Sequence, residues 1–251
     1  MMDYKRADEM VRGLTRDDGV LGYKPEQARL LLQVLRTLAR GRPVTGPEID
    51  AIAADLGWAP EAAQAFLRPL TERGAADAII GVLPGLSLGD HSHSFWVNGR
   101  RMSAWCAEDT LFLPALLEQT ATIESTSPLS RAPVRLTVGP GGVRSVDPPE
   151  AVVSIAIVDP GDTTLGSVEA IWKAFCRHIH FFATREEAAR WAAERGDIAI
   201  LTPDEGYQVG RQLVSRLLDQ AEVADGLRTT RDEGGPAPMG RPAVTVYYST
   251  T

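Results

Sequence analysis

Cys106 and Asp109 stand three residues apart in the stretch WCAEDTLFLP and could carry out chemistry together. Residues with this spacing share one face of a helix or a tight turn. An aspartate beside a thiol can take its proton and later give it to another atom. Residues 110–114 suggest the start of a helix, whose N-terminus would favour a thiolate. Burial near Trp105 and Phe112 would raise the pKa of Asp109. The sequence therefore predicts a proton shuttle.

Cys176, in WKAFCRHIHFF, is the second of only two cysteines. If both cysteines meet, their thiolates favour soft metals such as zinc, copper(I) and mercury(II). The histidines form two His-x-His pairs, each expected on one strand face: His91 with His93, and His178 with His180. A tetrahedral zinc site is thus an alternative, but the usual spacings of zinc ligands are absent. Structural histidines are therefore the favoured interpretation.

Three segments carry a family resemblance. RRMSAWCAEDTLFLPALL is followed by ESTSP and later by FCRHIHFFATREEAARWAAE. The WCA-x-DTL-x-x-PALL and FC-x-H-x-HFF blocks, in this order and at this separation, resemble the organomercurial (alkylmercury) lyases. A looser similarity extends from about residue 27 to about residue 222.

The resemblance implies a reaction and its residues. The family splits a carbon–mercury bond by protonolysis and releases a hydrocarbon and mercury(II). Its two cysteines and one aspartate match Cys106, Cys176 and Asp109, which would be the catalytic residues and would also hold the substrate or product mercury. No organic cofactor is implied, and free low-molecular-weight thiols would remove the metal. Trp105 and Phe112 suit the wall of an apolar pocket.

The chain departs from the family pattern at three places. Ser127 replaces a cysteine that many members carry and that is regarded as structural. Glu108 occupies a position that is usually apolar or aromatic, and it would raise the pKa of Asp109 if the two carboxyl groups lie close. The C-terminal tail is additional. These departures leave open a divergent enzyme of the same fold that acts on another organometal or on an unrelated substrate.

Composition limits the partners of the protein. The chain has 251 residues, 44% of them hydrophobic, a net charge of -7 and a pI of about 5.2. This balance gives no reason to expect nucleic acid as the main partner. No apolar run is long enough to span a membrane, and the polar N-terminus lacks a secretory signal. Two cysteines do not form a disulfide framework. We therefore expect a cytoplasmic protein without a membrane partner.

The N-terminal part, residues 1–90, is predicted to be a helical, winged-helix-like module. Helical spacing and breakers indicate helices within residues 25–41, 44–58 and 59–74, before a glycine-rich segment. A metal-responsive DNA-binding protein that senses metal through its two thiols is therefore a further alternative. The candidate recognition helix offers only Gln64 and Arg68 for contacts with DNA, which argues against this function.

The remaining chain is predicted to be an α+β catalytic core over 91–225, with a Gly/Pro-rich tail over 226–251. Hairpins and short strands dominate and no βαβ series is evident, so the sheet should be mostly antiparallel. The expected elements are a hairpin at 132–149, strands at 151–162, 178–182 and 198–202, and helices at 185–196 and 207–223. Thr184 and Glu187 form a predicted capping box. The last residues, VTVYYST, either belong to a disordered tail or add a strand.

Overall fold

The computed structural model describes residues 2–17, 19, 21–162 and 165–232. Its α-helices are α1 Met2–Leu14, α2 Pro25–Leu38, α3 Gly46–Leu56, α4 Pro60–Leu67, α5 Ala107–Leu117, α6 Val168–Ala174, α7 Arg185–Ala193 and α8 Pro203–Asp232. Its strands are β1 Thr71–Arg73, β2 Ile79–Val82, β3 Leu86–Ser87, β4 His93–Val97, β5 Arg100–Ala104, β6 Ala121–Thr126, β7 Pro133–Gly139, β8 Gly142–Asp147, β9 Val152–Ala156, β10 Phe181–Phe182 and β11 Ile198–Leu201. The predicted α+β class is confirmed.

Two antiparallel sheets form the β layer of the described chain. The large sheet has the order β1-β2-β3-β5-β4-β6-β7-β8, and the small sheet has the order β10-β9-β11. Asn98 and Gly99 both adopt positive φ angles in the turn between β4 and β5, which suits a tight hairpin. The predicted 132–149 hairpin is confirmed as β7 and β8. Alternate burial along β6 shows that the large sheet has one face in the core.

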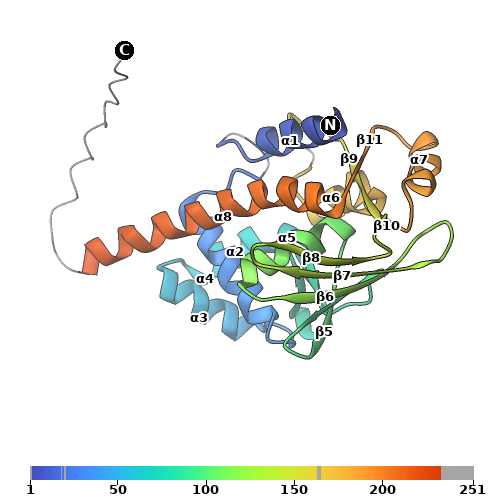
Figure 1. Ribbon diagram of the computed structural model, residues 1–251. Helices are drawn as coiled ribbons and strands as arrows, with labels where there is room; N and C mark the ends of the chain where they lie inside the picture. Colours follow the sequence, from blue (N-terminus) through green and yellow to red (C-terminus); the bar gives the residue numbers. More distant parts are fainter. Residues whose placement is uncertain (1, 18, 20, 163–164, 233–251) are drawn as a thin grey trace, which may run out of the picture.

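Helix α8 links the helical layer to the rest of the molecule (Figure 1). It packs against α1 on one side and against α2 and α5 on the other. Helix α5 in turn lies against β4, β5, β6 and β7 of the large sheet. Buried side chains from all of these elements form one continuous core, which includes Leu35, Leu111 and Tyr207. The N-terminal helices therefore share their core with the segments that carry both cysteines.

Several local predictions are corrected by the structure. The segment 178–182 is a strand only at Phe181–Phe182, because Cys176–His178 form a short 3-10 helix (η4). His178 and His180 therefore do not share a strand face, and of His91 and His93 only His93 lies in a strand. Helix α1 was not predicted, although Ala7, Met10, Val11 and Leu14 have helical spacing and are buried.

The C-terminal part also differs from expectation. Helix α8 continues through residues 226–232, which the sequence assigned to the tail. The predicted alternatives for VTVYYST fall on residues outside the described ones. No helix within the described residues combines the length and the apolar character that crossing a bilayer requires.

Candidate active site

The two cysteines and Asp109 come together in the folded chain. One sulfur from each of Cys106 and Cys176 and one carboxylate oxygen of Asp109 all lie within 4.8 Å of one another. All three residues are buried, and Cys106 is fully enclosed. The predicted proximity of the three side chains is therefore confirmed. Two sulfurs and one carboxyl oxygen at this separation can bind one soft metal ion.

Cys106 and Asp109 are positioned by the N-terminus of α5. Strand β5 leads directly into Cys106, which has extended backbone angles and occupies the N-cap position. Asp109 is the third residue of the helix, and its Oδ2 accepts a hydrogen bond from the backbone N–H of Cys106 at 2.8 Å. This bond satisfies a backbone donor at the helix end. The carboxyl group is thereby held beside Cys106.

Gly85 fixes the other side of the Asp109 carboxyl group. A Cβ atom at this position would lie 2.2 Å from both Cγ and Oδ2 of Asp109, and the φ angle of Gly85 is +97°. Only glycine combines that backbone angle with so close an approach. The carbonyl group of Gly85 accepts a hydrogen bond from the N–H of Trp105 at 2.9 Å, which ties this turn to the cysteine segment. Gly85 was not identified from the sequence.

Cys176 reaches the site from an irregular segment that follows α6. The N–H of Ala107 donates to the carbonyl oxygen of Ile179 at 3.3 Å, so the two cysteine segments are joined by a backbone hydrogen bond. Ser154 Oγ, on β9, donates to the carbonyl oxygen of His178 at 2.8 Å and accepts from the N–H of His180 at 3.0 Å. These contacts anchor η4 and hold Cys176 next to α5.

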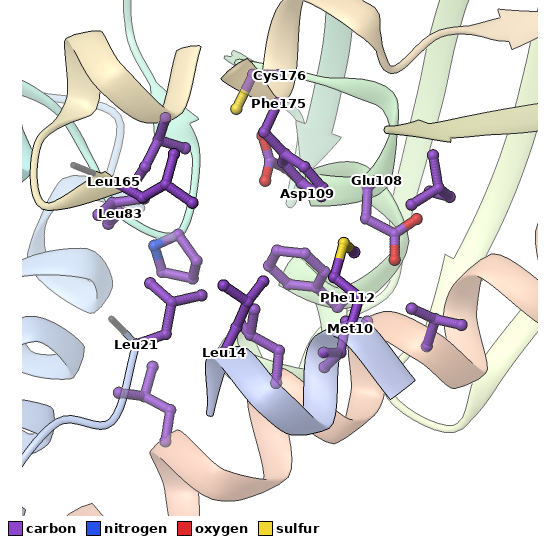
Figure 2. A pocket seen from close by; sticks show the side chains of 18 of the residues that line it. Met10, Leu14, Leu21, Leu83, Glu108, Asp109, Phe112, Leu165, Phe175 and Cys176 are labelled. Atoms are coloured by element: carbon purple, nitrogen blue, oxygen red, sulfur yellow. The ribbon is translucent and has the colours of Figure 1, made fainter. Parts of the chain in front are cut away.

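An apolar cavity lies beside the three residues (Figure 2). Asp109 and Cys176 line it, as does the adjacent Glu108, whereas Cys106 does not. The apolar lining comes largely from helices and loops outside the sheets and includes Met10, Leu14, Leu21, Leu83, Phe112, Leu165 and Phe175. The cavity suits a small apolar group attached to a thiophilic atom.

The ionisable groups of the site favour their neutral forms. Burial raises the pKa of Asp109 to about 7, although its hydrogen bonds with Cys106 act in the opposite direction. Burial, a hydrogen bond with Cys176 and the charge of Asp109 raise the pKa of Cys106 well above its usual value. For Cys176 the hydrogen bond with Cys106 lowers the pKa, while burial and the charge of Asp109 raise it, and the net direction is upward.

These directions confirm one electrostatic expectation and correct another. The pKa of Asp109 is raised, as predicted, and the cause is burial. The expected thiolate at Cys106 is not favoured in the resting protein, because desolvation of the fully enclosed sulfur raises its pKa. Glu108 and Asp109 do interact, and the interaction appears in the pKa of Glu108, which burial and, second, the charge of Asp109 raise.

The histidines serve other contacts. His93 is buried with Nδ1 2.8 Å from Ser125 Oγ, and burial lowers its pKa to about 3. His178 Nε2 accepts from Arg177 Nε at 3.0 Å, and His180 Nε2 lies 2.9 Å from the carbonyl oxygen of Arg177. Among the described residues, the one group that could hold a metal ion contains no histidine. The alternative of a zinc site built from both His-x-His pairs is therefore not supported.

Trp105 and Phe112 have different roles. Phe112 lines the cavity, as expected, but Trp105 does not. The indole Nε1–H of Trp105 donates to Glu72 Oε2 at 3.1 Å, and Ser87 Oγ donates to the same oxygen at 2.7 Å. A hydrogen bond with His91 is the main reason why the pKa of Glu72 falls to about 2. Glu72 was not identified from the sequence and anchors the residue before Cys106.

Ser127 lies in a structural contact. It is fully buried, and its Oγ donates to Glu187 Oε1 at 2.5 Å, while the N–H of Ser130 donates to the same oxygen at 2.6 Å. Thr184 Oγ1 accepts from the N–H of Glu187, so this half of the predicted capping box is confirmed. The Glu187 carboxylate thus connects α7 to the segment after β6. The family cysteine that Ser127 replaces would stand in this contact.

Known proteins give a consistent picture. The family model described as alkylmercury lyase (MerB) matches residues 86–215. Curated alkylmercury lyases from Pseudomonas putida and Streptomyces lividans are 35% and 37% identical to the chain, over 80% of its length in both cases and over 91% and 87% of their own. The chain belongs to the alkylmercury lyase family. The family assignment made from the sequence, and with it the assignment of the chain as an enzyme of this family, is confirmed.

A solved structure shares the fold. The crystal structure of the mercury-bound form of MerB2 aligns with a TM-score of 0.66 and covers 85% of this chain and 99% of its own. Its sequence is only 23% identical to this chain, so the comparison shows a shared fold alone. Residues 86–215, which the family model matches, contain Cys106, Asp109 and Cys176. They also contain Glu108 of α5 and Glu187 of α7.

Proposed function

We propose that this chain splits the carbon–mercury bond of organomercurials by protonolysis, with Cys106, Asp109 and Cys176 as its catalytic residues. The observation that supports this proposal is the placement of two sulfurs and a carboxyl oxygen within 4.8 Å of one another at an apolar cavity. Sulfur ligands suit mercury, the cavity suits its organic group, and the carboxyl group can carry a proton.

The order of events follows from the positions of the thiols. Cys176 lines the cavity and therefore meets the mercury atom first. The carboxylate of Asp109 takes the proton of one thiol, and the proton of the other thiol leaves to solvent. Once both thiolates bind mercury, electron density moves onto the carbon atom, and Asp109 delivers its proton there. One organomercury cation and two thiols thus give one hydrocarbon, one mercury(II) bound by two thiolates, and one released proton.

The pKa of Asp109 fits a group that must both accept and donate. A pKa of about 7 lets the carboxyl group exchange a proton near neutral pH, whereas an ordinary aspartate would be a poor donor. The apolar cavity excludes water and strengthens the interaction of the developing carbanion with that proton. In this mechanism mercury enters as substrate and leaves as product, bound by Cys106 and Cys176 with Asp109 beside them.

The same proposal covers partners and location. Its substrate is a small organomercurial, its reaction needs no organic cofactor, and free low-molecular-weight thiols exchange onto mercury(II) to release it. We propose a cytoplasmic protein, where such thiols are abundant, with neither nucleic acid nor membrane as a partner.

We also propose three regions: a winged-helix-like module over 1–90, a catalytic core over 91–225 and a tail over 226–251, of which 226–232 continue α8 as helix. The order α2, α3, α4 and then the β1–β2 pair supports the winged-helix arrangement. Val44, between α2 and α3, forms an antiparallel bridge with Ile79 of β2 and so adds a third chain segment to the wing.

The DNA-binding alternative has little support in this module. Gln64 Nε2 donates to Asp50 Oδ1 at 3.2 Å, and Arg68 pairs with Asp77 at 3.2 Å. Both candidate DNA-contacting residues of α4 and its C-cap are thus engaged with carboxylates of the same module. The net charge of -7 also opposes binding to a polyanion.

The proposal is tested with phenylmercury in excess thiol, by measuring released benzene for wild type, Asp109→Asn and the exposed control Asp55→Asn. Asparagine still accepts the Cys106 N–H bond but carries no transferable proton. We expect the loss of a general acid to slow benzene release by about 10²- to 10⁴-fold, with mercury binding retained and the control unchanged. Benzene release by Asp109→Asn at the wild-type rate would contradict the role of Asp109. Binding without benzene release by wild type would favour the divergent enzyme.

A further inference from the structure

Glu108 is a buried carboxyl group that has no hydrogen-bond partner in the described part of the chain. It is 4% exposed, and neither Oε1 nor Oε2 has a hydrogen-bond partner among the described residues. Buried polar atoms in folded proteins are almost always hydrogen-bonded, because leaving them unpaired costs free energy. Glu108 therefore adds no hydrogen bond or ion pair that would stabilise this fold. Such a group calls for an explanation by function.

The Glu108 side chain lines the same cavity as the proposed catalytic residues. Consecutive residues of an α-helix point about 100° apart around the axis, so Glu108 and Asp109 address different parts of the cavity from one turn of α5. In Figure 2 the Asp109 carboxyl group lies on the Cys176 side, and the Glu108 carboxyl group lies farther along the cavity and turns toward α8. Both Glu108 oxygens are covered in this position. A substrate whose mercury atom reaches the cysteines would extend its organic group past Glu108, and a rotation of this side chain would bring a carboxyl oxygen to that group.

Two glycines of α8 leave the space that the Glu108 carboxyl group occupies. A Cβ atom on Gly210 would lie 2.9 Å from Oε1, and one on Gly206 would lie 3.3 Å from Oε2. Both positions are inside a helix, where backbone N–H groups already bond within the helix. Helix α8 therefore admits the carboxyl group without offering it a donor. The remaining neighbours at these glycines, Leu111, Phe112 and Val153, are apolar.

We infer that Glu108 is a specificity-determining residue, which accepts a hydrogen bond from an O–H or N–H substituent on the organic group of the mercurial. A carboxyl group has acceptor oxygens in either protonation state, so this role does not depend on its charge. The substrate class is an aryl or alkyl mercurial with a hydroxyl or amino substituent remote from the mercury atom. The inference rests on the proposed lyase activity and adds the preference of the site.

The experiment compares 3- and 4-aminophenylmercury with 3- and 4-methylphenylmercury, a pair of substituents of similar size. The kcat/KM for release of aniline or toluene is measured for wild type, Glu108→Leu and Glu108→Gln, with Glu186→Leu on the exposed face of α7 as the control. The amino-to-methyl ratio is formed within each variant. Comparing these ratios between variants cancels the electronic effect of the substituent and any change in the shared chemistry.

For at least one isomer pair, we expect wild type to favour the amino compound and Glu108→Leu to lower the ratio by about tenfold or more, the value of one hydrogen bond to a buried acceptor. Glu108→Gln retains an acceptor oxygen in the same shape and should keep most of the preference, so the test does not depend on the folding of the leucine variant. The control should keep the wild-type ratio. Melting temperatures verify folding.

The outcomes distinguish a failure of the specificity role of Glu108 from a failure of the lyase proposal. If wild type splits all four compounds and every ratio is the same within twofold in wild type, Glu108→Leu and Glu108→Gln, the specificity role is overturned and the lyase proposal stands. If wild type splits phenylmercury but none of the four compounds, the specificity role is likewise overturned. If wild type splits neither phenylmercury nor any of the four compounds, the lyase proposal itself fails, and this inference fails with it.

Discussion

The two cysteines are held by different kinds of structure, although their sulfurs meet. Cys106 stands where a strand passes into a helix, and its place is set by the N-cap of α5 and the bond to Asp109. Cys176 lies in a short 3-10 helix, and side-chain and backbone contacts to β9 and α5 hold that segment. Regular local structure thus fixes the thiol that pairs with the acid, whereas tertiary contacts fix the thiol that lines the cavity.

This difference suits the proposed order of binding. In that proposal Cys106, which is enclosed and hydrogen-bonded to Asp109, is the second thiol to bind mercury and has a fixed position. Cys176 faces the cavity and is held there by contacts to β9 and α5, so it is the thiol that incoming mercury meets first in the proposed order. Variants that disturb the surroundings of Cys106 and those of Cys176 separately test this difference.

The largest effect is expected on the Cys106 side from Gly85→Ala. The added methyl group would overlap the Asp109 carboxyl group, and alanine is strained at a φ angle of +97°. We expect benzene release from phenylmercury to fall by at least about 100-fold, as for a misplaced general acid, together with a lower melting temperature. Gly46→Ala is the matched control, since nothing lies within 4 Å of its added Cβ. Wild-type turnover by Gly85→Ala would show that the Asp109 position tolerates displacement.

A smaller effect is expected on the Cys176 side from Ser154→Ala. This change removes the donor to the His178 carbonyl and the acceptor for the His180 N–H, which anchor η4. Loss of these buried bonds costs about 1–3 kcal/mol of stability. We expect the rate of benzene release to fall by about tenfold, because Cys176 is less well positioned. Ser145→Ala, at an exposed position of β8, should be neutral. Equal effects of the two serine variants would contradict the anchoring role of Ser154.

The third test measures how the free energy of unfolding depends on pH and involves no change in turnover. The pKa of Asp109 is about 7 in the folded state and near 3.8 when unperturbed, so the folded protein binds more protons between these values. The contribution of Asp109 to the free energy of unfolding should therefore decrease as pH rises from about 4 to 7 and level off above 7. His93, whose pKa is lowered to about 3, acts in the opposite direction, so the difference between wild type and Asp109→Asn isolates the contribution of Asp109. Thermal melting of wild type and variant across this range tests the sign, and parallel curves would contradict the raised pKa.

The sequence by itself determined the parts that depend on neighbouring residues. Helical spacing of leucines placed α2, the Pro-Gly-Gly turn placed the β7–β8 hairpin, and Thr184 placed the start of α7. The type and spacing of Cys106 and Asp109 already indicated a thiol beside a proton carrier. Cys176 was a candidate second thiolate from its residue type, and the resemblance assigned it to the same site, since nothing local connects residues 106 and 176. Helix α1 was available from the spacing of its buried residues and was missed.

Only the tertiary structure decided what surrounds these groups. Full enclosure of Cys106 raised the pKa of its thiol by desolvation, and this enclosure depends on elements distant in sequence. Trp105 turned from the cavity because Glu72, a residue 33 positions away, accepts its N–H. The room for Glu108 comes from Gly206 and Gly210 of α8. The order of residue types along the chain indicates local backbone preferences. The pKa of a side chain, its place in a pocket lining and its hydrogen-bond partners depend on residues that only folding brings near.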